Sequence, residues 1–203
     1  MTRLDQKTAT GAAVLDAARE EFERAGFEGA NLRAIAQRAG VSAGTVLHHF
    51  GDKRELLYAA LFQDLENTLA KVLADPGPGP LEEQLKRLTR GVFRYYQRRP
   101  GLSRPLLKES LFAEGAWAQR FAAQVGQAHG VVAKLADEAV ARGELRAGSN
   151  GPLFAVAYFS FFYFALISWV QGAHTNPGPL VERLVAQHLE GLRPLPSTKR
   201  SRR

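Results

Sequence analysis

Residues 31–58 have the sequence NLRAIAQRAGVSAGTVLHHFGDKRELLY, and they determine how the rest of the chain is interpreted. Apolar residues recur at helical spacing between Leu32 and Ala39, which predicts a short helix with one buried face. Asn31 directly before them is a favoured N-cap, because its side chain can accept a hydrogen bond from a backbone amide of the first turn. Gly40 tolerates the left-handed conformation that commonly follows a helix end. The pattern predicts a short helix and then a tight turn.

A second short helix is expected over residues 43–49, with Ser42 as its N-cap. Asp52 and Glu55 have the spacing of a capping box, which predicts that Asp52 is an N-cap and that a third helix starts at Lys53. Two short helices joined by a glycine-containing turn have the geometry of a helix-turn-helix. In that motif the second helix lies in the DNA major groove. The stretch therefore predicts a DNA-binding element.

The side of the second helix that is expected to face DNA carries small or hydroxyl-bearing side chains, which allow a close approach to phosphates. The hydroxyls of Ser42 and Thr45, together with the free amides of the helix start, can donate to phosphate oxygens. His48 can reach a base edge, and Lys53 can reach a phosphate. The complete set of expected DNA-contacting residues is Asn31, Arg33, Ser42, Ala43, Gly44, Thr45, Leu47, His48, His49 and Lys53.

From Ile35 to Leu56 the chain follows the pattern I-A-x-x-A-G-V-S-x-G-T-x-x-x-H-F-x-x-K-x-x-L. This pattern resembles the DNA-binding domain of the TetR family of bacterial repressors. The family usually has Thr where this chain has Asn31, which keeps the cap. It usually has a phosphate-contacting Tyr where this chain has Leu47, and leucine cannot form that hydrogen bond. The alternative is a helix-turn-helix that serves only as a packing unit, without DNA.

Composition is compatible with this interpretation. The chain has 203 residues, 45% of them hydrophobic, which is enough for a buried core in one domain or two small ones. It has no cysteine and no apolar signal-peptide core at its N-terminus, so we expect a cytoplasmic protein. The net charge of +7 suits a polyanionic partner. Residues 1–60 nevertheless hold equal numbers of basic and acidic side chains, so the motif carries the argument for DNA binding and the bulk charge does not.

Helical periodicity and Gly/Pro breaks along the whole chain predict an all-α fold of about nine helices. Ser103 is expected to cap the sixth helix, Ser149 or Asn150 the eighth, and Asn176 the ninth. We expect a helix-turn-helix domain over residues 1–52 and a helical ligand-binding and dimerisation domain over residues 53–193. A basic, disordered tail is expected over residues 194–203.

The stretch from Leu153 to Val170 is apolar and carries no charge. Its length is at the threshold for a membrane span, and the alternative is a helix buried on every side of a soluble protein. The resemblance to the TetR family favours burial, because the two C-terminal helices of each subunit in that family form a four-helix dimer interface. The residues expected at this interface are Tyr158, Phe161, Trp169, Leu184 and His188.

The middle helices are rich in aromatic residues, and the family resemblance implies an effector pocket among them. The alternative is that each aromatic side chain is ordinary core. The candidate ligand-binding residues are Phe93, Tyr96, Leu107, Leu111, Trp117, Phe121, Phe159, Phe162, Tyr163, Arg90 and Arg94. Arg87, Arg90, Arg94 and Arg98 recur on one helical stripe, which is either a solvated surface or an anion clamp. A clamp beside an apolar pocket would suit a fatty acid or an acyl-coenzyme A.

No arrangement typical of an enzyme is found. The five histidines do not form a metal-binding pair, and the H-E-x-x-H, phosphate-loop and G-x-S-x-G motifs do not occur. We expect no catalytic residues, no metal and no cofactor. Together with the motif, the resemblance to the TetR family implies a homodimeric, ligand-responsive transcriptional repressor that binds a near-palindromic DNA operator. The rival classes are a membrane-anchored helical protein and a small helical enzyme, and an activator would have the same sequence features as a repressor.

Overall fold

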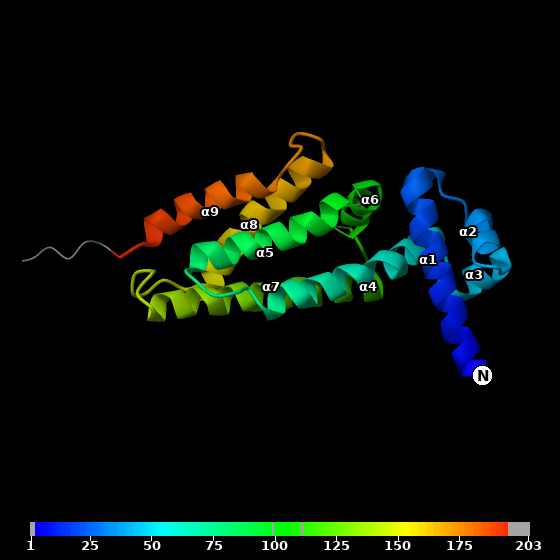
Figure 1. Cartoon of the computed structure of the whole chain (residues 1–203), viewed down its shortest axis with the longest axis horizontal. Helices are drawn as coiled ribbons and strands as arrows, with labels where there is room; N and C mark the ends of the chain where they lie inside the picture. The colour runs from blue at the N-terminus through cyan, green and yellow to red at the C-terminus, as the bar shows by residue number, and fades with distance from the viewer. Residues whose placement is uncertain (1–2, 99, 111, 195–203) are drawn as a thin grey trace, which may run out of the picture. The chain divides into compact units, whose positions relative to one another are not determined.

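The computed structural model describes residues 3–98, 100–110 and 112–194, and within these ranges it contains helices and no strands (Figure 1). This confirms the predicted all-α fold. The nine helices of this part of the chain are α1 (Arg3–Gly29), α2 (Leu32–Arg38), α3 (Ala43–Phe50), α4 (Lys53–Ala74), α5 (Leu81–Arg98), α6 (Pro100–Ser110), α7 (Gly115–Ala141), α8 (Gly151–Val170) and α9 (Gly178–Leu192). Leu111 and the tail from residue 195 lie outside the described residues.

The chain packs as two compact units. The first consists of Met1–Ala70 and Arg94–Phe121, and the second of Lys71–Phe93 and Ala122–Arg203. Helices α4, α5 and α7 each contribute residues to both units.

In the first unit, α1 packs against both α2 and α6. Val14, Ala18 and Phe22 form the buried stripe of α1, and all three are fully inaccessible to solvent. The regular helix is interrupted at Gly26, whose φ of 70° lies in the left-handed region. Ile35 of α2 is also fully buried, and α2 packs against both α1 and α3.

In the second unit, α8 and α9 pack side by side (Figure 1). Phe93 of α5 stacks on Phe162 of α8, with 4.6 Å between the ring centroids. The hydroxyl of Tyr158 forms a buried 2.9 Å hydrogen bond with that of Thr89 on α5. Burial raises the pKa of Tyr158 to about 12, so this phenol stays neutral and the hydrogen bond persists at physiological pH.

Two predicted helix starts are wrong. Helix α6 begins at Pro100 and not after Ser103, which lies buried inside the helix. Proline is compatible with a first helical turn, where its missing N–H would have no partner in any case. Helix α9 begins at Gly178, and its N-cap residue is Pro177, which makes no side-chain cap hydrogen bond, so the predicted Asn176 cap is not formed. The predicted Asn150 cap of α8 is confirmed by a 2.8 Å hydrogen bond from the Leu153 amide.

Gly151 lies at a close approach of α8 to α7. Its amide donates a 3.0 Å hydrogen bond to a carboxylate oxygen of Asp137. A Cβ atom here would overlap that carboxylate and the carbonyl oxygen of Ala133. Gly151→Ala should therefore lower the stability of the protein by roughly 1–3 kcal/mol, the usual cost of overpacking.

Thermal denaturation checks this expectation, with Gly126→Ala as the matched control. Gly126 lies on α7, where a Cβ atom would meet nothing within 4 Å. The same substitution there should stabilise the helix by up to about 1 kcal/mol. Equal effects of the two substitutions would contradict the close approach at Gly151.

Helix α8 is the one helix of the described residues that is long and apolar enough to cross a membrane. Length and composition alone are weak evidence, because a core helix meets the same criteria. Nine of its residues are buried in the subunit, among them Phe154, Tyr158, Leu166 and Trp169. Burial within the unit accounts for much of the apolar character of α8.

Candidate nucleic-acid interface

The turn between α2 and α3 is held by side-chain caps on both helices. The Asn31 carboxamide oxygen accepts a 2.9 Å hydrogen bond from the Arg33 amide. The Ser42 hydroxyl accepts a 3.0 Å hydrogen bond from the Thr45 amide. Between the two helices, Gly40 has a φ of 70°, so a residue with a side chain would be strained at this position. Both caps and the glycine turn agree with the sequence-based expectation.

Helix α3 has one buried side and one exposed side. Val46 is 1% exposed and anchors the helix to the core, whereas Leu47, the next residue, is 45% exposed. Gly44 and His48 are exposed on the same side as Leu47, and Ala43, Thr45 and His49 are partly exposed. The helix thus presents a narrow surface of Gly44, Leu47 and His48, which we call the α3 face.

The start of α4 follows α3 directly. A carboxylate oxygen of Asp52 accepts 2.8 Å hydrogen bonds from the amides of Arg54 and Glu55, so the predicted cap is present. The reciprocal half of the capping box is not seen, because the Asp52 amide donates to the carbonyl of Phe50 at 3.1 Å. The Glu55 carboxylate instead accepts a hydrogen bond from the indole N–H of Trp117.

Lys53 is attached to the end of α1. Its ammonium group donates a 2.9 Å hydrogen bond to the Glu28 carbonyl and lies 5.0 Å from the centre of the Phe27 ring. These contacts hold the amine near the start of α4. An ammonium group has three donors, so it can reach a phosphate without giving up the Glu28 contact.

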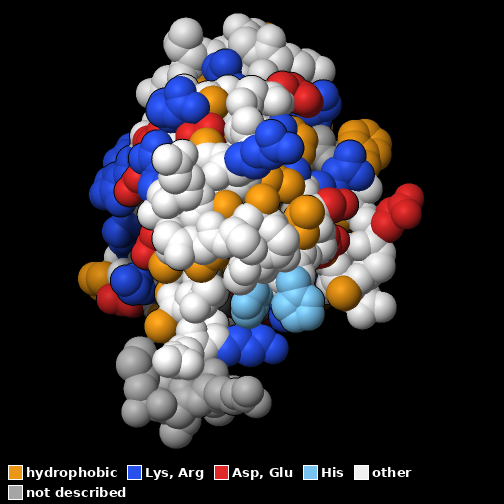
Figure 2. Space-filling view, turned by 90° about the vertical axis from the view of Figure 1, so that its right-hand side faces the viewer, with side chains coloured by type: hydrophobic (Ala, Val, Ile, Leu, Met, Phe, Trp, Pro, Cys, Tyr) orange, Lys and Arg blue, Asp and Glu red, His pale blue; other side chains and the backbone are white. Residues whose placement is uncertain are grey.

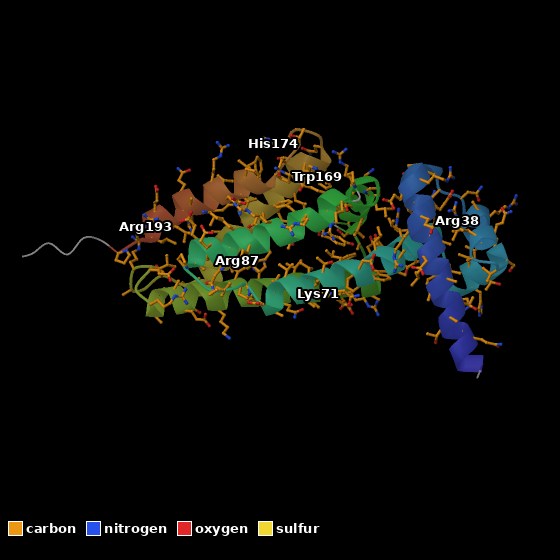
Figure 3. All side chains as sticks on the ribbon, viewed as in Figure 1. Arg38, Lys71, Arg87, Trp169, His174 and Arg193 are labelled. Carbon is orange, nitrogen blue, oxygen red and sulfur yellow. The ribbon has the colours of Figure 1, made fainter. Side chains whose placement is uncertain are left out.

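Helix α2 is fixed to α1 by ion pairs. Arg38, labelled in Figure 3, is 2.7 Å from the Glu20 carboxylate. Glu21 is buried, at 1% exposure, and accepts a 2.8 Å hydrogen bond from Arg24. That hydrogen bond, with the positive charges of Arg24 and Arg38, lowers the pKa of Glu21 below the ordinary 4.5.

The lowered pKa of Glu21 predicts a pH dependence of stability. A carboxyl group with a depressed folded-state pKa stabilises the protein above its unfolded pKa, and this stabilisation is lost as pH falls through the folded-state pKa. The melting temperature of the wild type should exceed that of Glu21→Gln at neutral pH, and the gap should narrow as the pH falls below about 5 and close as the pH passes through the folded-state pKa. Melting curves across this range check it, and a gap that does not change with pH would refute the assignment.

Charge over this end of the chain is mixed. On the face drawn in Figure 2, basic side chains are interspersed with acidic and apolar ones and form no continuous basic surface. This agrees with the equal numbers of acidic and basic residues in residues 1–60. Phosphate contacts from the helix start would therefore be few and local.

The candidate ligand-binding aromatics fall into two clusters, one in each unit. In the first unit Trp117 and Phe121 of α7 pack on Tyr58 and Phe62 of α4, with centroid distances from 5.3 to 5.7 Å. Tyr96 and Leu107 are buried in the same unit. In the second unit the cluster consists of Phe93, Phe159, Phe162, Tyr163 and His129, whose ring stacks 4.1 Å from that of Phe159. Sequence reasoning did not single out Tyr58, Phe62 or His129 as members of these clusters.

The predicted arginine stripe has two members with partners inside the second unit. Arg90 forms two 2.7 Å hydrogen bonds with the Glu182 carboxylate of α9. Arg87, labelled in Figure 3, donates a 2.7 Å hydrogen bond to the Pro76 carbonyl. Arg94 is exposed and belongs to the first unit. Among the described residues, no group of three or more His, Cys, Asp or Glu side chains is placed to hold a metal ion.

Two of the residues predicted at a dimer interface are inside the subunit. Tyr158 and Trp169 are buried in the core of the second unit, whereas Phe161, Leu184 and His188 are partly exposed. The exposed side of α8 carries large apolar residues at helical spacing. Ser160 interrupts this row, and its hydroxyl donates a 2.8 Å hydrogen bond to the Val156 carbonyl. We call this surface, formed by Leu153, Val156, Phe164 and Ile167, the α8 face.

Known proteins resemble both the motif and the fold. The model of the family described as bacterial regulatory proteins, tetR family, matches residues 14–60. The transcriptional repressor KstR of Rhodococcus jostii is 33% identical over 129 residues, which cover 64% of this chain and 57% of KstR. The transcriptional regulator UidR of Escherichia coli is 43% identical over 58 residues, which cover 29% of this chain and 30% of UidR. The matched part is well short of the full length of either relative.

The fold as a whole is also similar to a solved structure. FadR of Bacillus subtilis, a transcriptional regulator described in complex with stearoyl-CoA, has a TM-score of 0.71 to this chain at 17% identity, covering 89% of this chain and 98% of FadR. At this identity the likeness concerns the fold alone. KstR, UidR and FadR are described as transcriptional regulators and not as enzymes. The family model falls on the helices that carry the capped turn and the α3 face, so residues 14–60 match the bacterial regulatory proteins of the tetR family.

Proposed function

We propose that the chain is a cytoplasmic, DNA-binding transcriptional repressor that acts as a homodimer and is released from its operator by a small effector. The observation that carries the proposal is the α3 face. A capped two-turn helix is anchored by a buried valine and exposes small, apolar and imidazole side chains on its other side. Such a helix fits the major groove, which is wide enough to admit it.

The α8 face supports the homodimer. Monomeric soluble proteins rarely expose a contiguous row of large apolar side chains, and such a surface usually marks an interaction site. The apolar α8 face of a second subunit would bury this surface, because a two-fold symmetric interface pairs the same surface of both subunits. A dimer would present two copies of α3 to one duplex, about 34–36 Å apart or at a multiple of that distance, and would read a near-palindrome.

For the effector we propose an amphipathic anion, either a fatty acid or an acyl-coenzyme A. The aromatic cluster of the first unit offers apolar surface, and the exposed Arg94 of the same unit offers a positive charge. The stearoyl-CoA of the FadR complex supports this chemical class by analogy of fold. Effector binding must favour a state with lower DNA affinity, and a coupling of about 1–3 kcal/mol would weaken binding roughly 5- to 150-fold.

The DNA-binding proposal is tested by selecting duplexes from a random pool with the purified protein. The expected result is enrichment of a near-palindromic sequence whose affinity falls as salt rises. No enrichment over several rounds would overturn the proposal.

The effector proposal is tested separately by titration calorimetry with a series of acyl-CoA and fatty acid chain lengths. We expect saturable binding and, in a parallel experiment, release of the selected duplex by the same ligand. Absence of heat across the series would remove this effector class and leave the DNA-binding proposal intact.

A further inference from the structure

Helix α3 lacks the side chains that usually pair with base edges. Specific contacts in the major groove come most often from Arg or Lys to guanine, Asn or Gln to adenine, and Asp or Glu to cytosine. The sequence of α3, AGTVLHHF, contains none of these residue types. Recognition of the base sequence by this helix must therefore use contacts other than those from Arg, Lys, Asn, Gln, Asp or Glu side chains.

The hydroxyl groups at the start of α3 are already engaged within the protein. The Ser42 hydroxyl caps the Thr45 amide at 3.0 Å, and the two hydroxyls lie 2.9 Å apart in a hydrogen bond of their own. They can still contact a phosphate, which positions the helix without reading the sequence. On the α3 face this leaves His48 and Leu47 as the side chains long enough to meet a base.

Leu47 is placed to make an apolar contact in the groove. It is 45% exposed, whereas Val46 beside it is 1% exposed, so Leu47 does not serve the core of the first unit. Gly44 lies one turn earlier on the same side, and its lack of a side chain permits a close approach of the helix to DNA. The apolar group that the floor of the major groove offers is the C5 methyl of thymine.

We propose that Leu47 is a specificity-determining residue that reads the 5-methyl group of a thymine in each half of the operator. The proposal rests on the DNA-binding function proposed above and deepens it. Contact would remove the leucine side chain and the thymine methyl from water together, whereas cytosine or uracil at the same position would leave the leucine side chain without an apolar partner. The chain would thus select a thymine without forming a hydrogen bond to it.

The experiment uses the full chain and the duplex that it selects from the random pool. Each thymine of that duplex is replaced in turn by uracil, symmetrically in both halves, which removes the methyl group and leaves the hydrogen-bonding groups unchanged. At one symmetric position we expect affinity to fall about fourfold per half-site, the effect of one buried methyl-sized group. The same penalty should persist in Leu47→Met, which keeps an apolar side chain of similar reach.

The decisive comparison is with Leu47→Ala. This variant should bind the thymine and uracil duplexes equally, because its side chain no longer reaches the methyl group. His48→Ala is the matched control on the same face, and it should keep the uracil penalty at the Leu47 position. The proposal is overturned if no thymine shows the penalty, or if Leu47→Ala retains it in full. Failure of the wild type to select any duplex is a different result, which overturns the DNA-binding function and the proposal with it.

Discussion

Gly44→Glu is expected to abolish specific DNA binding while leaving the fold intact. Gly44 is exposed on α3, and a Cβ atom at this position has its nearest neighbour, the Ser42 hydroxyl oxygen, at 3.6 Å. A carboxylate in the first turn of a helix also interacts favourably with the helix dipole. In the complex the same carboxylate would lie against phosphates of the DNA. For two like charges about 5 Å apart at an effective dielectric constant near 20, the repulsion is roughly 3 kcal/mol per subunit.

The measurement is the affinity for the selected duplex, together with the melting temperature of the free protein. We expect affinity to fall at least about 100-fold, since each 1.4 kcal/mol is a factor of ten. Gly126→Glu is the control, because it adds the same charge at an open, exposed position on α7. If the two variants lost the same affinity for the duplex, net charge and not the placement of α3 would govern DNA binding.

Phe164→Glu is expected to convert the proposed dimer to monomers. Phe164 is 58% exposed and lies in the α8 face between Val156 and Ile167. In a dimer closed by this face the new carboxylate would be buried without a partner, which costs several kcal/mol for each ion. We expect the dissociation constant of the dimer to rise at least about 100-fold. Operator affinity should fall as well, because the two copies of α3 would no longer bind the duplex as one linked pair.

Sedimentation velocity at several protein concentrations measures this change. Gln127→Glu is the control, since it adds a carboxylate to an exposed position on a different helix, α7. The helix content and melting curve of Phe164→Glu should remain those of a folded protein, because the wild-type side chain contributes little to the subunit core. A Phe164→Glu protein that remains a dimer would show that the α8 face is not the interface.

The helix-turn-helix was accessible to sequence reasoning because its signals are local. Asn31, Gly40 and Ser42 act on amides or torsion angles within a few residues, so their roles follow from chain position alone. The same holds for the cap of α4 at Asp52. The error at Ser103 arose because a capping residue is also acceptable inside a helix when it is buried, and only packing distinguishes the two situations.

Contacts between residues far apart in the chain could not be predicted from the sequence in this way. The pairing of Arg90 with Glu182 joins residues far apart in sequence, and periodicity alone suggested a solvated stripe or an anion clamp. The bond from Trp117 to Glu55 likewise replaced half of a capping box that looked complete in the sequence. In α8 nearly every residue is apolar, so no sequence pattern separated Tyr158 and Trp169, which face the core, from the exposed α8 face.

The most direct test of DNA recognition by α3 is a hydroxyl-radical footprint of the protein on its selected duplex. Two copies of α3 in successive major grooves should protect two equivalent patches of backbone, related by a two-fold axis and centred about 34–36 Å apart or at a multiple of that distance. Protection should disappear with Gly44→Glu and remain with Gly126→Glu. Uniform cleavage by the radical, or a single patch without symmetry, would contradict the claim that α3 is presented twice to one double helix.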